Sequence, residues 1–290
     1  MGRERLAWKG LTSVVTGASS GIGRELALRL ARRGARVALV ARRRERLEAL
    51  ADEIRRHGGE ALPVACDVAS REGVAAAAAL IVQALGPIDL LVNNAGVGRH
   101  RRFLDWEVSD IERMMAINYL GTVYWTKALL PQMVERRRGW LVFMSSAAGR
   151  IGTPDESAYV ATKFALAGLA ESLGLEVEPL GIHTLTVFPG ALRTELLDAE
   201  SLARMPAVAR RMLREPQPLV ERILKALESG RREVVYPWTI SAGFVVRTLA
   251  PGFFRRMLRR TTLGAERPDL PPPREQRPDR SSTDPGGTAR

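Results

Sequence analysis

Short runs of aliphatic and β-branched residues alternate with longer helical stretches through most of this chain, and that alternation limits the fold more than any other feature. The apolar runs are nearly continuous, which is typical of parallel strands covered on both faces. Right-handed crossovers then place helices on both sides of one sheet. We therefore predict an α/β fold with a doubly wound parallel sheet of about seven strands, at 12–16, 36–41, 61–66, 88–93, 140–145, 183–188 and 233–236. The helices are predicted at 22–33, 44–57, 72–85, 109–136, 156–178 and 219–229.

The chain divides into one domain and two C-terminal segments. Residues 1–236 carry the repeated strand and helix pattern, which loses its regularity in a proline-containing segment at about 191–218. Residues 237–263 form an extension that combines apolar residues with arginines. Proline, arginine, aspartate, serine and glycine dominate residues 264–290, and we expect this tail to be disordered.

The composition limits the classes of function. The net charge of +12 raises the question of nucleic acid, but the arginines are spread over many predicted helices and no nucleic-acid-binding module is evident. We therefore expect a solvated basic surface and no nucleic-acid partner. The one cysteine, Cys66, rules out an internal disulfide, and the three scattered histidines predict no metal site. The first residues carry charges and no apolar run, which favours a cytoplasmic location.

A glycine-rich turn directly follows the first predicted strand and opens into a helix, with the sequence TGASSGIG at 16–23. Such a turn lets the backbone approach a pyrophosphate, and the helix N-terminus supplies amide donors and a favourable dipole. In this interpretation Gly17 makes the turn, Gly21 leaves room for the phosphate and Gly23 lets the helix pack on the sheet. The segment therefore predicts a dinucleotide site built from Gly17, Ser19, Ser20, Gly21, Ile22 and Gly23.

The end of the second strand indicates which dinucleotide is bound. An NAD site usually has an acidic residue there to bind the ribose hydroxyls. This chain has Ala41 followed by Arg42 and Arg43. A guanidinium can pair with a 2′-phosphate that a carboxylate would repel. We therefore favour NADP(H) over NAD(H), and predict that Arg42 contacts the 2′-phosphate with Ser19 and Arg43 in support.

Asp67 and Val68 follow the third predicted strand and complete this half of the site. From its position Asp67 can meet the adenine edge of the cofactor, and a capping role for its carboxylate is equally consistent with the sequence.

Tyr159 and Lys163 are four residues apart in a predicted helix, so their side chains share one face. An ammonium beside a phenol favours the ionised phenol and allows it to exchange a proton near neutral pH. Taken alone, such a pair is more often a half-buried tyrosine beside a solvated lysine. Its interpretation depends on the residues around it.

The glycine turn, the segment NNAG at 93–96, Asn118, Ser146, the Tyr159 and Lys163 pair, and Pro189-Gly190 together resemble the short-chain dehydrogenase/reductase family over about 9–194. The resemblance implies a Rossmann-type NADP-binding domain with a substrate lid at about 191–218. It implies that Tyr159 is the general acid or base, that Lys163 lowers the pKa of Tyr159 and binds the nicotinamide ribose, that Ser146 binds the substrate oxygen, and that Asn118 anchors a proton-relaying water.

Each of these residues also has a purely structural interpretation: Ser146 can cap the exit of its strand, and Asn118 can bridge backbone groups within its helix. The resemblance further implies cofactor contacts from two segments. Asn94, Ala95 and Gly96 would shape the floor of the cofactor cleft. Pro189, Gly190 and Thr194 would lie beside the nicotinamide.

The implied activity is hydride transfer between NADP(H) and a small-molecule carbonyl or secondary alcohol, for which we favour an apolar or lipid-like compound. Two alternatives remain open: a reductase of 3-oxoacyl groups on a carrier protein or coenzyme A, and an NADPH-binding regulator without turnover. The sequence after about 231 departs from the compact 3-oxoacyl reductases, which weakens the first alternative. We expect a homodimer or homotetramer.

Two further features of the sequence concern the substrate and partners. Arginines at 99, 101, 102 and 150 can form a basic rim that steers an anionic substrate, although solvated arginines are the simpler interpretation. The extension at 237–263 is too interrupted to span a bilayer. It can lie on a membrane at the inner face, or it can cover the cleft or pack on a partner subunit, and we favour the second alternative.

Overall fold

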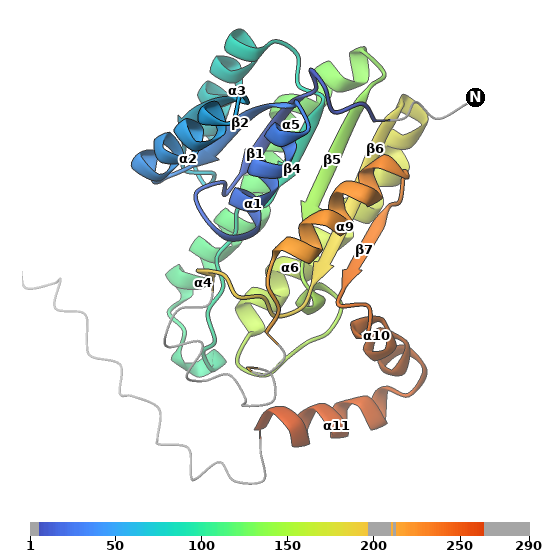
Figure 1. Cartoon of the computed structure of the whole chain (residues 1–290). Coiled ribbons are helices and arrows are strands. Elements are labelled where there is room, and N and C mark those ends of the chain that lie inside the picture. The colour runs from blue at the N-terminus through green and yellow to red at the C-terminus, as the bar shows by residue number, and fades with distance from the viewer. Residues whose placement is uncertain (1–5, 197–209, 211–212, 264–290) are drawn as a thin grey trace, which may run out of the picture.

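The computed structural model describes residues 6–196, 210 and 213–263. Its centre is a seven-stranded parallel sheet with the order β3-β2-β1-β4-β5-β6-β7 (Figure 1). The strands are β1 Thr12–Thr16, β2 Arg36–Ala41, β3 Glu60–Ala65, β4 Leu90–Asn93, β5 Gly139–Met144, β6 Ile182–Pro189 and β7 Glu233–Tyr236. The predicted Rossmann-type sheet is thereby confirmed. Its winding reverses between β1 and β4, and in open sheets of this kind ligands bind at the carboxyl ends of the strands beside such a reversal.

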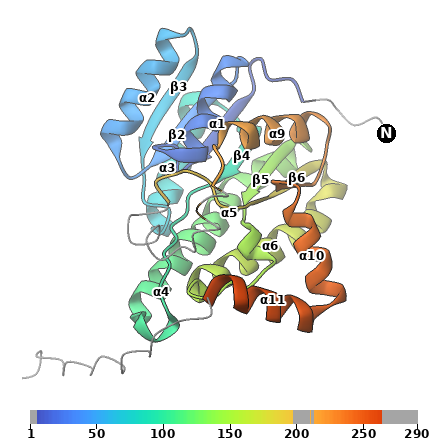
Figure 2. The ribbon, with the colours of Figure 1, turned by 60° about the horizontal axis from the view of Figure 1, so that its bottom comes forward.

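Helices cover both faces of the sheet, and each face has its own apolar core (Figures 1 and 2). One core is filled from α1 Gly21–Arg32, α2 Arg44–Arg56 and α9 Gln217–Glu228. The other is filled from α3 Arg71–Leu85, α5 Gly121–Glu135 and α6 Ser157–Val177. Successive strand residues alternate between them, so Val15 lies in the first core and Val14 in the second. Both faces are therefore buried, as the continuous apolar runs predict.

The helix predicted at 109–136 is interrupted by a widened turn. It consists of α4 Val108–Met115, a π-helical turn η2 Ala116–Leu120 and α5, without a break in the chain direction. Single π turns inside α-helices are frequent at functional sites. Asn118 lies in this turn, fully buried. Short 3₁₀ turns occur at η1 Phe103–Asp105, η3 Ala147–Gly149 and η4 Glu178–Leu180.

The extension after β7 forms two helices, α10 Ile240–Leu249 and α11 Pro251–Leu263. They are separated at Ala250, because the residue before a proline is disfavoured in helical geometry. Both helices lie at the end of the sheet where α4 also lies (Figures 1 and 2). Most of the predicted lid at 191–218 and the whole tail at 264–290 lie outside the described residues. In the part of the chain that the structure describes, no helix is long and apolar enough to cross a bilayer.

Candidate active site

The glycine turn after β1 is packed against neighbouring backbone. Gly17 and Gly21 have φ angles of +68° and +55°, which glycine adopts without strain. A Cβ on Gly17 would come within 2.8 Å of the Nδ2 atom of Asn94. A Cβ on Gly23 would collide with the carbonyl oxygen of Gly17 and lie 2.9 Å from its carbonyl carbon. The turn therefore requires glycine at these positions, as the sequence predicts.

A hydroxyl group that the sequence analysis missed fixes the turn to the end of β4. The Thr16 Oγ1 atom donates to the carbonyl oxygen of Val92 at 3.2 Å and accepts from the amides of Asn94 at 2.9 Å and Ala95 at 3.0 Å. The Asn94 Nδ2 atom in turn donates to the carbonyl oxygen of Thr16 at 2.9 Å. A threonine directly before the first glycine is the sequence signal for this contact. Asn94 and Ala95 thus hold the glycine turn against the end of β4, and their contact with a cofactor stays a prediction.

The start of α1 fits the phosphates of a dinucleotide. Ser20 is the N-cap residue but makes no side-chain capping hydrogen bond, and the first turn of α1 contains no acidic residue. The first amides of the helix are therefore not capped by a side chain. Thr194 lies next to the turn, since its Cβ and Cγ2 atoms are 3.2 Å from a Cβ built on Gly21. Gly190 lies at the end of β6, where its amide donates to the carbonyl oxygen of Tyr236 at 2.7 Å and a Cβ on it would meet Ile240 and Pro237.

The arginine that reaches the glycine turn is Arg43. Its Nη2 atom donates to Ser19 Oγ at 2.8 Å and to Ser20 Oγ at 2.9 Å, and its Nη1 atom donates to Glu195 at 2.7 Å. Arg42 is exposed and acts on Asp67 only through its charge. Of the two arginines, Arg43 is thus the one that contacts the glycine turn, and the contact of Arg42 with a 2′-phosphate stays a prediction.

Asp67 has two partners within the protein. Its Oδ1 atom accepts from the amide of Ala69 at 3.0 Å, and its other oxygen pairs with Arg113. Burial alone would raise the pKa of Asp67, but the Ala69 amide and the Arg113 guanidinium bring the pKa below its usual value. The N-cap of α3 is Ser70, so Asp67 does not cap that helix but closes the turn before it through the Ala69 amide, and its contact with the adenine stays a prediction. Val68 packs beside it against Gly121.

Three of the predicted catalytic side chains converge at the carboxyl end of β5. Tyr159 and Lys163 lie in the first turns of α6, and both are buried. Ser146, just after β5, is hydrogen-bonded to the phenol of Tyr159. The Ser146 Oγ atom also accepts from the amide of Ala148 at 3.1 Å, which caps η3, and donates to the carbonyl oxygen of Pro189 at 3.5 Å. The chemical and the capping interpretations of Ser146 therefore coexist.

Burial controls the electrostatics of the tyrosine and lysine pair. Burial raises the pKa of Tyr159, and the hydrogen bond to Ser146 opposes only part of that effect. Burial also lowers the pKa of Lys163 to about 8. The Lys163 Nζ atom donates to the carbonyl oxygen of Met144 at 2.9 Å and lies 5.6 Å from the centroid of the Tyr159 ring. Within the protein alone, desolvation therefore outweighs the expected lowering of the tyrosine pKa by the lysine, and the phenol is a protonated donor.

Asn118 fixes the segment that follows β4. Its Oδ1 atom accepts from the amide of Val97 at 2.8 Å, and its Nδ2 atom donates to the carbonyl oxygen of Val97 at 2.9 Å and to Thr162 Oγ1 at 3.0 Å. It therefore bridges backbone groups of a distant segment and the catalytic helix α6. A Cβ on Gly96 would lie 3.3 Å from Asn118 Oδ1 and 3.5 Å from Lys163 Nζ.

Two residues that the sequence analysis missed lie close to Tyr159. A Cβ on Gly98 would be 3.2 Å from the Cδ2 atom of Tyr159 and 3.8 Å from the Cγ atom of Leu196. Backbone at Gly98 and an apolar side chain from the start of the lid thus flank the phenol. A second glycine shortly after NNAG is the signal that could have indicated this close approach.

Acidic partners neutralise most of the predicted basic rim. Arg101 pairs with Asp110 at 3.4 Å and Arg102 with Asp105 at 2.7 Å. Arg150 pairs with Glu233. Within the described residues, these pairs leave little net positive charge at the rim to steer an anionic substrate.

The comparison with known families decides the identity. The family model described as short chain dehydrogenase matches residues 12–204, which include the glycine turn and all four predicted catalytic residues. The chain belongs to the short-chain dehydrogenase family. It is 43% identical to a 3-ketodihydrosphingosine reductase of Bos taurus over 189 residues, which are 63% of this chain and 57% of the bovine protein. The chain thus spans less than two thirds of the length of that relative.

Two solved structures that resemble this chain contain a bound nicotinamide dinucleotide. A metagenomic short-chain oxidoreductase in complex with NADP is 31% identical, with a TM-score of 0.68 and coverage of 79% of this chain and 98% of that chain. A short-chain dehydrogenase/reductase of Burkholderia phymatum in complex with NAD is 23% identical, with a TM-score of 0.77 and coverage of 91% and 100%. The second likeness shows the fold alone.

Proposed function

We propose that this chain is an NADP(H)-dependent oxidoreductase that interconverts a carbonyl and a secondary alcohol, with an apolar or lipid-like substrate. The observation that carries the proposal is the cluster of the half-buried Ser146 with the buried Tyr159 and Lys163 at the carboxyl end of β5. This edge of the sheet also carries the glycine turn, because all seven strands are parallel. A proton donor and a dinucleotide site therefore face the same cleft.

The chemistry of the cluster follows from its protonation. When bound, the nicotinamide cofactor supplies or accepts the hydride. In the reducing direction the protonated phenol of Tyr159 donates to the substrate oxygen, while the Ser146 hydroxyl binds that oxygen. The ammonium of Lys163 lies close enough to stabilise the phenolate that Tyr159 becomes. In the oxidising direction Tyr159 accepts the proton instead.

The preference for NADP(H) is supported by Arg43. Its guanidinium already meets the hydroxyls of Ser19 and Ser20 beside the glycine turn, and Arg46 lies close enough to share Glu195 with it. Ala41 occupies the position where an acidic residue would bind the ribose of NAD. These groups suit the charge of a 2′-phosphate.

The apolar substrate is supported by Leu196 and by the neutralised rim. Leu196 approaches the backbone that covers the phenol, whereas the rim arginines are paired with carboxylates. The bovine relative is, by its name, a reductase of a sphingoid ketone.

The decisive test is Tyr159→Phe, assayed with NADPH and a series of ketones and aldehydes of graded chain length. We expect turnover to fall by about 10²-fold or more, since general acid catalysis contributes on that order, with NADPH binding by fluorescence titration unchanged. Tyr124→Phe, a half-buried tyrosine on α5, is the matched control and should keep full turnover. Retained turnover in Tyr159→Phe contradicts the mechanism. NADPH binding by the unaltered protein without turnover of any compound would favour the regulator.

The cofactor preference is tested by Arg43→Ala and Arg42→Ala, compared with NADPH and NADH. Loss of a charged hydrogen-bonding partner at Arg43 should raise the KM for NADPH by roughly 10- to 100-fold and leave that for NADH unchanged. Arg42→Ala should have the smaller effect, because Arg42 makes no contact with the turn. If neither change alters the ratio of the two KM values, the NADP(H) proposal is wrong.

A further inference from the structure

The extension exposes an unusual amount of apolar surface. Of the twelve large hydrophobic side chains that are exposed in the described residues, five lie between 238 and 257. Trp238, Val245 and Leu249 are 68%, 55% and 79% exposed. Val245 and Leu249 are four residues apart and share one side of α10, and Trp238 lies in the turn just before that helix. Phe253, on α11, is 62% exposed. We name these four residues the apolar ridge. Several large exposed apolar side chains gathered in one short segment indicate an interaction site.

The charge of the extension has one sign. Residues 237–263 contain five arginines and no aspartate or glutamate. Arg256, Arg259 and Arg260 on α11 are exposed, and within the described residues none of them forms an ion pair. Elsewhere the surface arginines are commonly paired, as at the rim of the cleft. The extension therefore combines apolar side chains with unneutralised positive charge.

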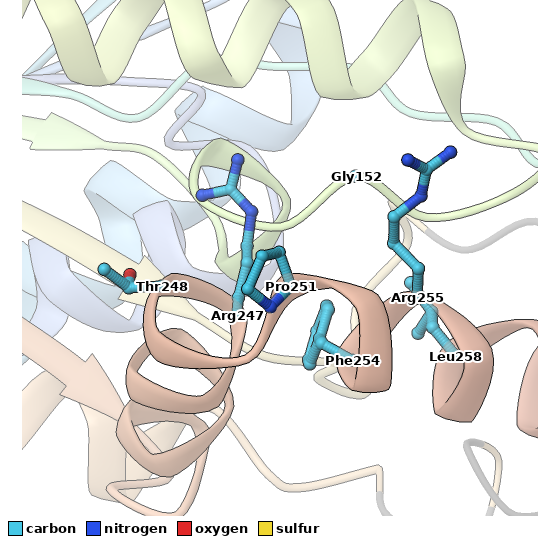
Figure 3. A pocket seen from close by; sticks show the side chains of 7 residues that line it. All are labelled: Gly152, Arg247, Thr248, Pro251, Phe254, Arg255 and Leu258. Atoms are coloured by element: carbon cyan, nitrogen blue, oxygen red, sulfur yellow. The ribbon is translucent and has the colours of Figure 1, made fainter.

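The extension is anchored to the domain by its other side. Phe254 is 6% exposed, and Phe244 meets Phe188 at the end of β6 with ring centroids 6.2 Å apart. Between α10, α11 and the loop at Gly152 lies a cavity of about 450 Å³. Figure 3 shows Arg247 and Arg255 extending from the two helices toward the side on which Gly152 lies. The inner side is thus occupied by the protein, and the apolar ridge lies outside these contacts.

We propose that the apolar ridge and the exposed arginines of α11 bind the surface of an anionic lipid bilayer. Aromatic and aliphatic side chains enter the interface of a bilayer, while arginines meet anionic headgroups. A second copy of this chain is a poorer occupant, because two arginine-rich faces repel each other and each chain carries a net charge of +12. An anionic surface attracts the positive charge of the extension. The apolar ridge contributes binding free energy that salt does not screen.

More apolar surface lies at the same end of the molecule. Phe103 and Leu104 on η1 and Val108 at the start of α4 are 65%, 83% and 69% exposed. Figure 2 shows α4, α10 and α11 at the end of the molecule that is turned toward the viewer. Peripheral docking would therefore bring the bilayer to the end of the sheet where the active-site cleft lies.

The first experiment is co-sedimentation of the full chain with vesicles of phosphatidylcholine, with and without phosphatidylglycerol, at low and high salt. We expect binding to the phosphatidylglycerol vesicles that weakens with salt. Arg256→Glu/Arg260→Glu should reduce it by about tenfold or more, since each arginine near an anionic surface contributes roughly fivefold. Arg56→Glu/Arg71→Glu, at exposed positions on α2 and α3, is the matched control and should bind normally.

The second experiment separates apolar insertion from charge. Leu249→Ser/Phe253→Ser should weaken vesicle binding, whereas Leu80→Ser/Leu175→Ser, at other exposed leucines, should not. Of the five tryptophans only Trp238 is in the exposed class. Its emission should therefore shift to the blue on vesicles, and Trp238→Phe should remove the shift while the protein still sediments.

The outcomes decide between occupants. Equal binding by all variants, or no binding to phosphatidylglycerol vesicles, overturns the proposal. If Leu249→Ser/Phe253→Ser turns a dimer into a monomer in light scattering without changing vesicle binding, the apolar ridge is a subunit interface instead. Turnover of a soluble substrate should be the same in all these variants, so a failure of membrane binding is distinct from a failure of the proposed chemistry.

Discussion

The glycine turn after β1 and the C-terminal extension differ in how they are packed. In the turn, backbone meets backbone, and a single added carbon at Gly23 would collide with Gly17. In the extension, α10 has no buried residue, and a Cβ added at Gly252 would meet nothing within 4 Å. The first region can bind only what its backbone geometry admits. Apart from the side that carries Phe244 and Phe254, the side chains of the second are not fixed by packing, so the composition of its exposed side reflects what it meets outside the protein.

The largest expected effect comes from adding one methyl group to each region. Gly23→Ala forces the backbone of the turn apart and should cost about 2–3 kcal/mol of the free energy of unfolding, as overpacking does. NADPH binding should be lost with it, because the amides that meet the phosphates move. Gly252→Ala removes a glycine from a helix with open space around it, and should stabilise the protein by about 0.5–1 kcal/mol.

Urea denaturation and NADPH titration of the two variants measure both effects. If Gly23→Ala binds NADPH normally, the turn is more adaptable than its contacts indicate. If Gly252→Ala is destabilising, the added methyl group meets a neighbour at that position, and the contrast between the two regions is smaller than the structure shows.

The sequence predicted the first region better than the second for a physical reason. Strand order and the glycine turn depend on local backbone rules, so Gly17 and Gly23 were assigned roles that the geometry supports, whereas the space that Gly21 leaves for a phosphate stays a prediction. Which of Arg42 and Arg43 contacts the glycine turn was not predictable, because it depends on which guanidinium turns toward Ser19. The packing of Phe254 near the loop at Gly152 depends on contacts between segments about a hundred residues apart.

The helix predicted at 109–136 shows the same limit within one element. Its periodicity indicated a single helix, and the chain does continue in one direction. The π turn at Asn118 arises where a buried amide side chain joins Val97 and Thr162 from other segments. Neither partner is visible from the local sequence, and the structural role of Asn118 therefore became clear only from the fold.

The next largest expected effect is the pH dependence of stability, which differs between a buried lysine and an exposed arginine. Burial lowers the pKa of Lys163 from 10.5 to about 8, so between these values the unfolded chain binds a proton that the folded protein lacks. Stability due to Lys163 must therefore rise with pH in that window. Relative to Lys163→Met, the free energy of unfolding should increase by about 2 kcal/mol from about pH 8 to about pH 10. The pKa of neighbouring Tyr159 is raised, so the folded protein keeps that proton.

Urea denaturation of the protein and of Lys163→Met at several pH values measures this difference, and taking the difference removes the contribution of other groups such as Cys66. Arg259→Met, at an exposed position of the extension, is the matched control and should give a flat difference. A flat difference for Lys163→Met as well would mean that water reaches the lysine, and that the catalytic end is no drier than the extension.

The smallest expected effect comes from an exposed ion pair beside the proposed cofactor site. Glu195, 53% exposed at the start of the predicted lid, pairs with Arg43 and Arg46 at 2.7 Å. The hydrogen bonds from Arg43 and Arg46 lower the pKa of Glu195. Its carboxylate is therefore ionised and would compete with a 2′-phosphate for the Arg43 guanidinium.

Because exposed ion pairs contribute little, Glu195→Gln should tighten NADPH binding by only about two- to fivefold. NADH binding should not change, and Glu48→Gln, in the nearby exposed pair with Arg44, should change neither. Weaker NADPH binding in Glu195→Gln would mean that the carboxylate positions Arg43 for the phosphate instead of competing with it.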